Sequence, residues 1–360
     1  MNTQEIQFYR QGQVGVIVLN RAQVLNAMSM EMCIDMKLQL DYWREDDQVK
    51  VVVIRGNGEK AFCSGGDIRA LYHHGRENVA QSQKFFWHEY RLNRTIARYP
   101  KPYVALCHGI TMGGGVGVSI HGSHRVGAID LKWAMPETGI GFFTDVGATY
   151  FLNRLPGSIG MFLGLTGQPL NVADALFANI IDYVVPYKNF DEVIESLSEA
   201  DLGNNHHDSV HRILHGMALI SPKAPLSPES FVLEKNLADI NACFSEDSLI
   251  NLLQALSAQK TIFCEQMLNQ LATKSPTSLH VVFAALHDRP ESEDIDEALK
   301  LEYRIVTHML QAHDFYEGVR AALIDKDHQP YWQPASLKNV ENTMTSTYFE
   351  PLAQELNFES

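Results

Sequence analysis

The 360-residue sequence is poor in positive charge. It contains 29 Lys and Arg residues against 43 Asp and Glu residues, and its formal net charge at pH 7 is −14. A surface that binds nucleic acid needs clustered Lys and Arg to neutralise phosphates. The composition therefore argues against a nucleic-acid partner, and any phosphorylated ligand must be held by a local group of cations.

Closely spaced cysteines and long apolar runs are also missing. No two of the five cysteines are closer than 21 residues, which excludes CxxC and zinc-ribbon spacings and predicts reduced thiols. The most apolar window, residues 103–120, contains five glycines and His108, which is typical of a buried strand, turn and helix rather than a membrane span. Residues 1–12 lack the basic and apolar regions of a signal peptide. We therefore expect a soluble, cytoplasmic protein.

Short β-branched runs alternate with helix-length segments in the first half of the chain. Strands are predicted at 14–20, 49–55, 103–108 and 124–129, and helices at 28–43, 79–98 and before 124. This alternation predicts an α/β fold. A helical stretch and a short strand are expected within 157–185, and residues 190–320 are predicted to be mostly helical, with a proline-rich break at 221–230.

Two glycine-rich segments and one pair of acids are the candidate chemical groups. KAFCSGGD (60–67) and HGITMGGGVG (108–117) each follow a predicted strand. Because glycine has no Cβ, two such loops can bring backbone N–H groups together on one oxygen, as an oxyanion hole requires. In MPETGIGFFTDVG (135–147), Glu137 and Asp145 flank a run of glycine and apolar residues that would raise the pKa of a carboxyl group.

Together with VGVIVLN (14–20) and NRAQVLNAM (20–28), these segments resemble the crotonase superfamily (enoyl-CoA hydratase/isomerase) over roughly residues 8–190. The resemblance implies an α/β protein with the crotonase (ClpP-like) spiral fold of ββα units and a helical C-terminal region. It places the catalytic core in residues 1–200 and a mostly helical region that covers the acyl-CoA site in residues 201–360.

Within this superfamily the sequence is similar to the 3-hydroxyisobutyryl-CoA hydrolase branch. Gly117 stands where hydratases carry a catalytic glutamate, and Asp145 follows Glu137 by eight residues, as in the hydrolases. The sequence departs from the usual pattern at Ala22 and Thr144, where prolines are common. Three C-terminal segments extend the similarity: SPTSL (275–279), EALKLEYR (297–304) and HDFYEGVRAALIDKD (313–327).

The resemblance implies an acyl-CoA thioester hydrolase, with 3-hydroxyisobutyryl-CoA of valine catabolism as the expected substrate. The N–H groups of Gly66 and Gly114 are the expected oxyanion donors, and Gly117 is an expected substrate-binding position. Glu137 is expected to act as nucleophile or general base. Asp145 is expected to orient the water or the substrate's 3-hydroxyl group or to transfer a proton, and the alternative is an aspartate that caps the turn before Val146 and Gly147. No metal or redox cofactor is implied, because coenzyme A is part of the substrate.

Other interpretations stay open. Arg69 and Lys326 are candidate cations for the CoA phosphates, although each could also be a solvated surface residue. An enoyl-CoA hydratase or isomerase is the alternative enzyme, and a non-catalytic crotonase-fold binding protein is the alternative of another class. A homo-oligomer is open as well, since trimers are common in the superfamily while the helical C-terminal region could cover the same surface.

Two further motifs fit less well. A G-x-S-x-G elbow around Ser119 fails because His121 occupies the last position, and we expect Ser119 inside a helix. The histidine pairs at 73–74 and 206–207 point apart on regular structure and lack a carboxylate motif, so no metal site is predicted.

Overall fold

The computed structural model describes residues 5–219, 231–287 and 294–358, so the predicted proline-rich break at 221–230 lies outside the described residues. The chain divides into two compact units, each built from three separate stretches. The first unit contains Met1–Gly66, Arg91–Trp133 and Leu170–Val232, and the second contains Asp67–Tyr90, Ala134–Pro169 and Leu233–Ser360. The predicted division of the chain at residue 200 stays a prediction.

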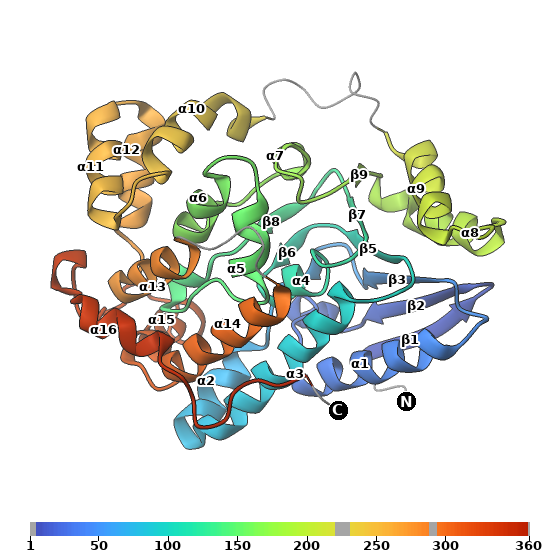
Figure 1. Cartoon of the computed structure of the whole chain (residues 1–360), viewed down its shortest axis with the longest axis horizontal. Coiled ribbons are helices and arrows are strands. Elements are labelled where there is room, and N and C mark those ends of the chain that lie inside the picture. The colour runs from blue at the N-terminus through green and yellow to red at the C-terminus, as the bar shows by residue number, and fades with distance from the viewer. Residues whose placement is uncertain (1–4, 220–230, 288–293, 359–360) are drawn as a thin grey trace. The chain divides into compact units, whose positions relative to one another are not determined.

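A six-stranded sheet in the order β1-β2-β3-β5-β7-β9 organises the first unit (Figure 1). Strand β1 is antiparallel to β2, and the remaining neighbours pair in parallel. Val51 to Ile54 of β3 are all fully buried, as expected for a strand in the middle of a parallel sheet. The strands are β1 (Ile6–Gln11), β2 (Val14–Leu19), β3 (Val51–Gly56), β5 (Tyr103–Cys107), β7 (His124–Gly127) and β9 (Tyr183–Val184).

A second sheet has three short strands in the order β4-β6-β8. These are β4 (Ala61–Cys63), β6 (Ile110–Met112) and β8 (Lys132–Ala134). Along the chain, β3, β5 and β7 join the large sheet, and each is followed by a strand of the small sheet. Each turn of the chain thus contributes one strand to each sheet, which confirms the predicted spiral of ββα units.

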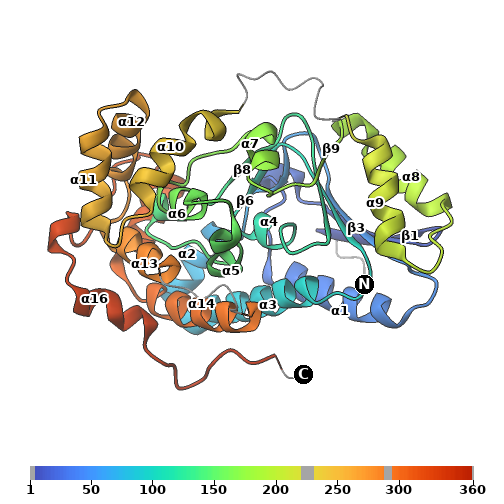
Figure 2. The same cartoon turned by 45° about the horizontal axis from the view of Figure 1, so that its top comes forward.

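The helices of the first unit cover its large sheet. In α1 (Met30–Glu45), the Ser29 side chain accepts from the Met32 N–H and caps the helix, and Met32 and Met36 are buried in the core. Helices α8 (Phe190–Glu199) and α9 (His206–Met217) lie side by side (Figure 2), and their apolar faces pack with valines of β2 and β3 in one hydrophobic cluster. Short helices α4 (Gly114–Gly117) and α7 (Val172–Phe177) complete this unit.

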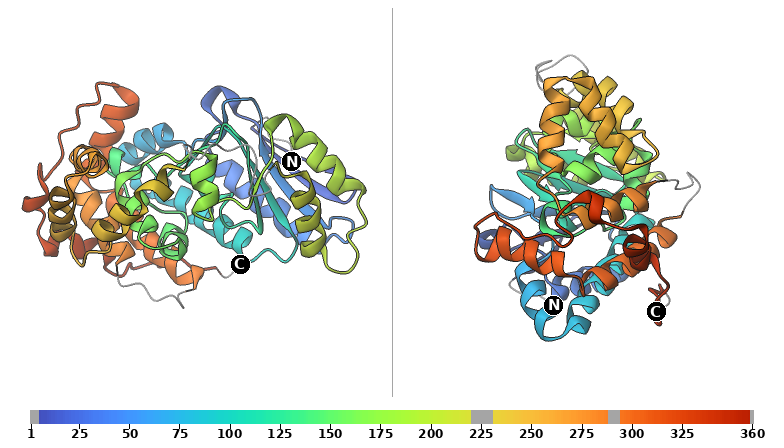
Figure 3. Two further views of the ribbon diagram at one scale, coloured as in Figure 1. Left: turned by 90° about the horizontal axis from the view of Figure 1, so that it is seen from above. Right: turned by 90° about the vertical axis from the view of Figure 1, so that its left-hand side faces the viewer.

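The second unit is mainly helical, as predicted for the C-terminal region. Helices α11 and α12 lie side by side (Figure 3, orange), and α13 begins with Ser275 as its cap and Pro276 in its first turn. The helices are α2 (Ile68–Glu77), α5 (Ala148–Phe151), α6 (Ile159–Thr166), α10 (Val232–Phe244), α11 (Leu249–Gln259), α12 (Ile262–Leu271), α13 (Pro276–Leu286), α14 (Ile295–Met309), α15 (His313–Val319) and α16 (Asn342–Ser346). Helix α3 (Val79–Ala97) spans the boundary between the units, which follows Tyr90.

The segment before residue 124 corrects one prediction. Helix α4 has four residues instead of a full helix, and Ser119 lies beyond its C-cap at Val118 rather than in a helix interior. Three of the four residues of α4 are glycines, which are poor helix formers. The Ser119 hydroxyl donates to the carbonyl oxygen of Gly115 at 2.8 Å, so it is used within the turn.

Candidate active site

The first glycine loop is held against the segment 25–28 of the same unit. After β4 ends at Cys63, the Ser64 N–H donates to the Leu25 carbonyl oxygen at 2.9 Å, and the Met28 N–H donates to the Gly65 carbonyl oxygen at 2.8 Å. Gly65 has φ +116°, a conformation that other residues rarely adopt. The NRAQVLNAM segment therefore fixes the backbone directly before Gly66, the first predicted oxyanion donor.

The second glycine loop packs directly on the first. A Cβ added to Gly65 would lie 3.6 Å from the nitrogen of Gly114, and one added to Gly115 would lie 2.4 Å from the Cys63 carbonyl oxygen. Gly114 is the first residue of α4, so its N–H has no partner within the helix. Among the backbone hydrogen bonds of turns, loops and caps in the described ranges, none has the N–H of Gly66 or Gly114 as donor. The two predicted donors thus lie on loops in backbone contact; their action on one oxygen stays a prediction.

Gly117 closes the short helix that begins at Gly114. It is buried, and its N–H donates to the carbonyl oxygen of Gly113 at 3.1 Å. With no side chain at this position, the helix carries no acid here. A reaction that needs a carboxylate from this helix is therefore unavailable to the first unit.

Glu137 lies in a buried turn of the second unit. It begins a 3₁₀ helix, Glu137–Ile140, and 6% of the residue's surface is exposed. Its Oε2 has no hydrogen-bond partner among the described residues. Burial raises the pKa of Glu137 well above its usual value, the negative charge of Asp145 raises it further, and the cation of Lys274 opposes both effects. The carboxyl group is therefore buried, incompletely paired and unusually basic.

Asp145 is held by a tyrosine from α3. The Tyr90 hydroxyl donates to Asp145 Oδ2 at 2.8 Å, and Asp145 is 4% exposed. Burial raises the pKa of Asp145 to about 7, although the hydrogen bond from Tyr90 opposes this rise. At neutral pH the Asp145 carboxyl can therefore be found with or without its proton, as a proton-transfer group requires.

Sequence reasoning missed Glu89, which lies beside these acids. Glu89 is 2% exposed, and its Oε1 has no partner in the described part of the chain. Burial raises the pKa of Glu89 well above its usual value, and the charges of Asp145 and Glu137 add to the rise. The available signal was a glutamate among the buried apolar residues Phe86 and Leu92 of an amphipathic helix.

Two other functional candidates, Glu302 and Lys274, were also missed. Glu302 is fully buried in α14 and accepts hydrogen bonds from the backbone of Gly147 and Thr149, just after Asp145. Burial lowers the pKa of Lys274, and the nearby Glu137 raises it. Both lie in or beside the C-terminal segments 297–304 and 275–279, whose motif resemblance was the signal that could have found them.

The chain is similar to known proteins over most of its length. A family model described as Enoyl-CoA hydratase/isomerase matches residues 14–349. The chain belongs to this family, the crotonase superfamily. It is 41% identical over 349 residues to a protein of Danio rerio named 3-hydroxyisobutyryl-CoA hydrolase, mitochondrial, and 97% of this chain and 90% of that protein are covered. The human protein of the same name is 38% identical over 357 residues, with 99% and 91% covered.

Solved structures confirm the crotonase fold. A carnitinyl-CoA dehydratase from Mycobacterium thermoresistibile superposes with a TM-score of 0.90 at 36% identity, and 99% of each chain is covered. An enoyl-CoA hydratase from Rhodobacter sphaeroides 2.4.1 gives 0.87 at 35% identity, covering 98% of this chain and all of that one. These names denote chemistries other than hydrolysis, so the crotonase fold alone does not choose the reaction.

The two predicted CoA-binding cations of this crotonase lie in neighbouring segments of the second unit. Arg69, in the first turn of α2, is exposed and its Nη2 donates to the Leu323 carbonyl oxygen at 2.8 Å. Lys326 follows Leu323 by three residues, is exposed and has φ +59°. The structure thus brings together the segments that carry both cations, while their binding of CoA stays a prediction.

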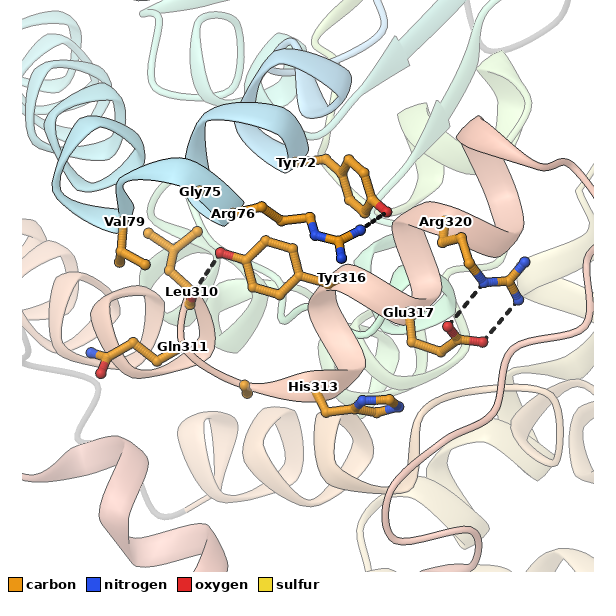
Figure 4. A pocket seen from close by; sticks show the side chains of 11 residues that line it. Tyr72, Gly75, Arg76, Val79, Leu310, Gln311, His313, Tyr316, Glu317 and Arg320 are labelled. Carbon is orange, nitrogen blue, oxygen red and sulfur yellow. Dashed lines mark hydrogen bonds and ion pairs between the residues drawn. The ribbon is translucent and has the colours of Figure 1, made fainter.

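A pocket of about 720 Å³ lies between α2 and residues 310–320 (Figure 4). Arg76 donates to the Tyr72 hydroxyl at 2.8 Å, and the Tyr316 hydroxyl donates to the Leu310 carbonyl oxygen at 2.7 Å. None of the predicted catalytic residues lines it. The lining residues are Tyr72, Gly75, Arg76, Val79, Leu310, Gln311, Ala312, His313, Tyr316, Glu317 and Arg320.

Residues 5–219, 231–287 and 294–358 contain neither a candidate membrane span nor a candidate metal cluster. No helix there has the length and apolar character that crossing a bilayer requires. No cluster of three or more His, Cys, Asp or Glu side chains there is arranged to hold a metal ion. The five cysteines are buried free thiols.

Proposed function

We propose that this crotonase-family protein hydrolyses the thioester of a short β-hydroxyacyl-CoA, with 3-hydroxyisobutyryl-CoA of valine catabolism as the preferred substrate. The products are 3-hydroxyisobutyrate and CoA. The observation that carries the proposal is the buried Glu137 carboxyl with an unpartnered oxygen, combined with glycine at position 117. The names of the similar vertebrate proteins support the same substrate.

Glu137 supplies the attack in this mechanism. A carboxylate with a raised pKa is a stronger base, so it can remove a proton from water as the water attacks the thioester carbon. The same oxygen can instead attack the carbon directly and form an anhydride that water then opens. In either route the N–H groups of Gly66 and Gly114 stabilise the negative charge that develops on the thioester oxygen.

Asp145 and Glu89 complete the proton and hydroxyl chemistry. With a pKa of about 7, Asp145 can carry the proton that the departing thiolate of CoA needs. Burial raises the pKa of Glu89 well above its usual value, which favours its protonated form, and a protonated Glu89 can donate a hydrogen bond to the substrate's 3-hydroxyl group. A hydroxyl-bearing acyl group is therefore favoured over a plain alkyl chain.

A thiol-release assay across acyl-CoA esters tests this function. The purified protein is given 3-hydroxyisobutyryl-CoA, 3-hydroxypropionyl-CoA, isobutyryl-CoA and acetyl-CoA, and free thiol is measured. We expect the highest kcat/KM for the two hydroxylated esters. Faster release from isobutyryl-CoA than from 3-hydroxyisobutyryl-CoA would contradict the role given to the hydroxyl group.

The second candidate is an enoyl-CoA hydratase. Hydration needs two acids around an alkene, and the buried Glu89 offers a second acid beside Glu137 that the glycine at 117 does not. An assay of crotonyl-CoA hydration in the same preparation separates the two reactions. Hydration is measured as the loss of absorbance of the conjugated thioester. A hydration rate above the hydrolysis rate would favour this candidate. A non-catalytic binding protein would show neither reaction.

The cytoplasmic location and a homo-oligomeric state are further proposals. The acidic composition and reduced thiols support the first, and the habit of the superfamily supports the second. Cell fractionation and analytical ultracentrifugation of the native protein test them separately.

A further inference from the structure

The buried carboxyl group of Glu302 binds the turn that follows Asp145. Its Oε2 accepts the N–H of Gly147 at 2.6 Å. Its Oε1 accepts both the N–H and the hydroxyl of Thr149, at 2.9 and 2.7 Å. Glu302 is fully buried, so these donors replace water around both carboxyl oxygens. Helix α14 is thereby tied to the loop that carries a predicted catalytic residue.

The turn held in this way has a strained backbone. Val146 has φ +54°, in the left-handed region, where a β-branched side chain crowds the backbone. Gly147 follows with φ +86°, and it offers no side chain to cap α5. Strained conformations persist only where surrounding contacts hold them. The Glu302 carboxyl supplies such contacts, because it takes the first N–H groups at the start of α5.

Asp145 is consequently held at two points. Tyr90 binds its carboxyl oxygen at 2.8 Å, and Glu302 binds the backbone two residues later. The Ala148 N–H also donates to the Asp145 carbonyl oxygen at 3.0 Å, which closes the turn. The direction of the Asp145 side chain therefore depends on the shape of residues 145–147 as well as on Tyr90.

We propose that Glu302 is a positioning residue that holds the strained Asp145–Gly147 turn and so fixes the direction in which Asp145 presents its carboxyl group. The link to turnover rests on the proposed function, which gives Asp145 its part in thioester hydrolysis. Glu302 itself touches no reacting atom in that mechanism. A purely structural role would instead make Glu302 a cap of α5 with no effect on chemistry.

Glu302→Gln is the primary test. The amide replaces one acceptor oxygen with an NH₂ donor that faces another donor, while the side chain keeps its size. We expect kcat to fall about tenfold or more through misplacement of Asp145, with KM changed less than about twofold. Val306→Ala, in the buried face of the same helix, is the matched control: it should lower the melting temperature and leave kcat unchanged. Loss of stability without loss of kcat in E302Q would overturn the proposal.

A second substitution separates positioning from capping. Glycine adopts positive φ without strain, so Val146→Gly in the E302Q background should restore part of the lost kcat. A cap role predicts that kcat does not recover. An unrecovered kcat in the double variant would therefore count against positioning. If E302Q fails to fold, Thr149→Val removes one donor to Glu302 and keeps the backbone N–H; we expect a smaller loss of kcat in the same direction, and an unchanged kcat would contradict the proposal.

Crystal structures of wild type and E302Q distinguish this inference from the proposed function. Positioning predicts a shift of the Asp145 carboxyl by about 1 Å or more in E302Q. If the wild type releases thiol from no acyl-CoA but Asp145 shifts, the hydrolase function fails and positioning stands. If the wild type hydrolyses acyl-CoA and Asp145 does not shift, positioning fails and the function stands.

Discussion

The two units of this crotonase offer different chemical groups. The first unit contributes backbone N–H groups from two glycine loops, Gly65–Gly66 and Gly113–Gly115, in which positive φ at Gly65 and Gly113 and the close approach of Gly115 to Cys63 favour glycine. The second contributes buried carboxyl groups with raised pKa values, including Glu137 and Asp145. Backbone donors depend on local geometry and hardly on pH, whereas buried acids depend on every charge around them. Substitutions in the first unit should therefore act on backbone geometry, and substitutions in the second unit should act on pKa values and proton transfer.

The largest effect on turnover is expected from Glu137→Gln in the second unit. Loss of the nucleophile or base should reduce kcat by at least about 10²-fold. Stability should not fall, because the amide removes a buried charge that faces Asp145. Turnover assays, thermal melting and CoA binding by calorimetry check these three points. Near-normal turnover would remove Glu137 from the mechanism.

Gly65→Ala, in the first unit, should lower both stability and turnover by changing the backbone geometry of the glycine loop. At φ +116° an alanine is strained, so we expect unfolding to become easier by about 1–3 kcal/mol. Displacement of the following N–H should lower kcat about tenfold. Gly203→Ala is the control, since Gly203 also has positive φ but a Cβ there meets no atom within 4 Å. Equal kcat losses in both variants would contradict a local role for Gly65.

The pH dependence of kcat/KM should change only when charged residues of the second unit are substituted. Glu137 acts as its ionised form, so kcat/KM should rise as pH rises through its pKa. Asp145 raises the pKa of Glu137, and Lys274 lowers it. Asp145→Asn should therefore move the rising limb to lower pH, and Lys274→Met should move it to higher pH. Rates measured from pH 5 to 10 test both signs, and shifts in the same direction would refute this account.

The smallest effect is expected at the exposed cations. Arg69→Ala and Lys326→Ala should each raise KM for acyl-CoA a fewfold and leave kcat unchanged, since solvent-exposed charges contribute little. The N-acetylcysteamine thioester of the same acid lacks the nucleotide and should show no change. A similar rise in KM with this truncated substrate would exclude a role at the CoA phosphates.

Most of the fold was predictable because β-branched runs and helical periodicity are local signals. Strands β2, β3, β5 and β7 lie where the sequence placed them. Strands β1, β4, β6 and β8 were not predicted: β4, β6 and β8 have three residues each, too few to show a period, and β1 mixes polar with apolar residues. The prediction of a helix-length segment before 124 was wrong because consecutive glycines there form only a short turn of helix.

The candidate site was predictable where one residue type carries the chemistry. Glycines indicate a close approach of two backbone segments, and two acids in an apolar run indicate carboxyl groups with raised pKa values. Glu89 and Glu302 escaped because nothing in their own neighbourhoods shows which loop they contact. Their roles depend on residues from other parts of the sequence: the charges of Asp145 and Glu137 act on Glu89, and the N–H groups of Gly147 and Thr149 bind Glu302.

By itself the sequence determined the alternation of strands and helices, the two glycine loops, the acids Glu137 and Asp145 and the missing acid at position 117, because each of these is a pattern of neighbouring residues. Tertiary structure alone decided how basic those acids are and how they are held. Burial, the charge of Lys274 and the hydrogen bonds of Tyr90 and Glu302 come from residues far away in the chain. Electrostatic energy depends on distance in space and on exclusion of water, and only folding sets either of them.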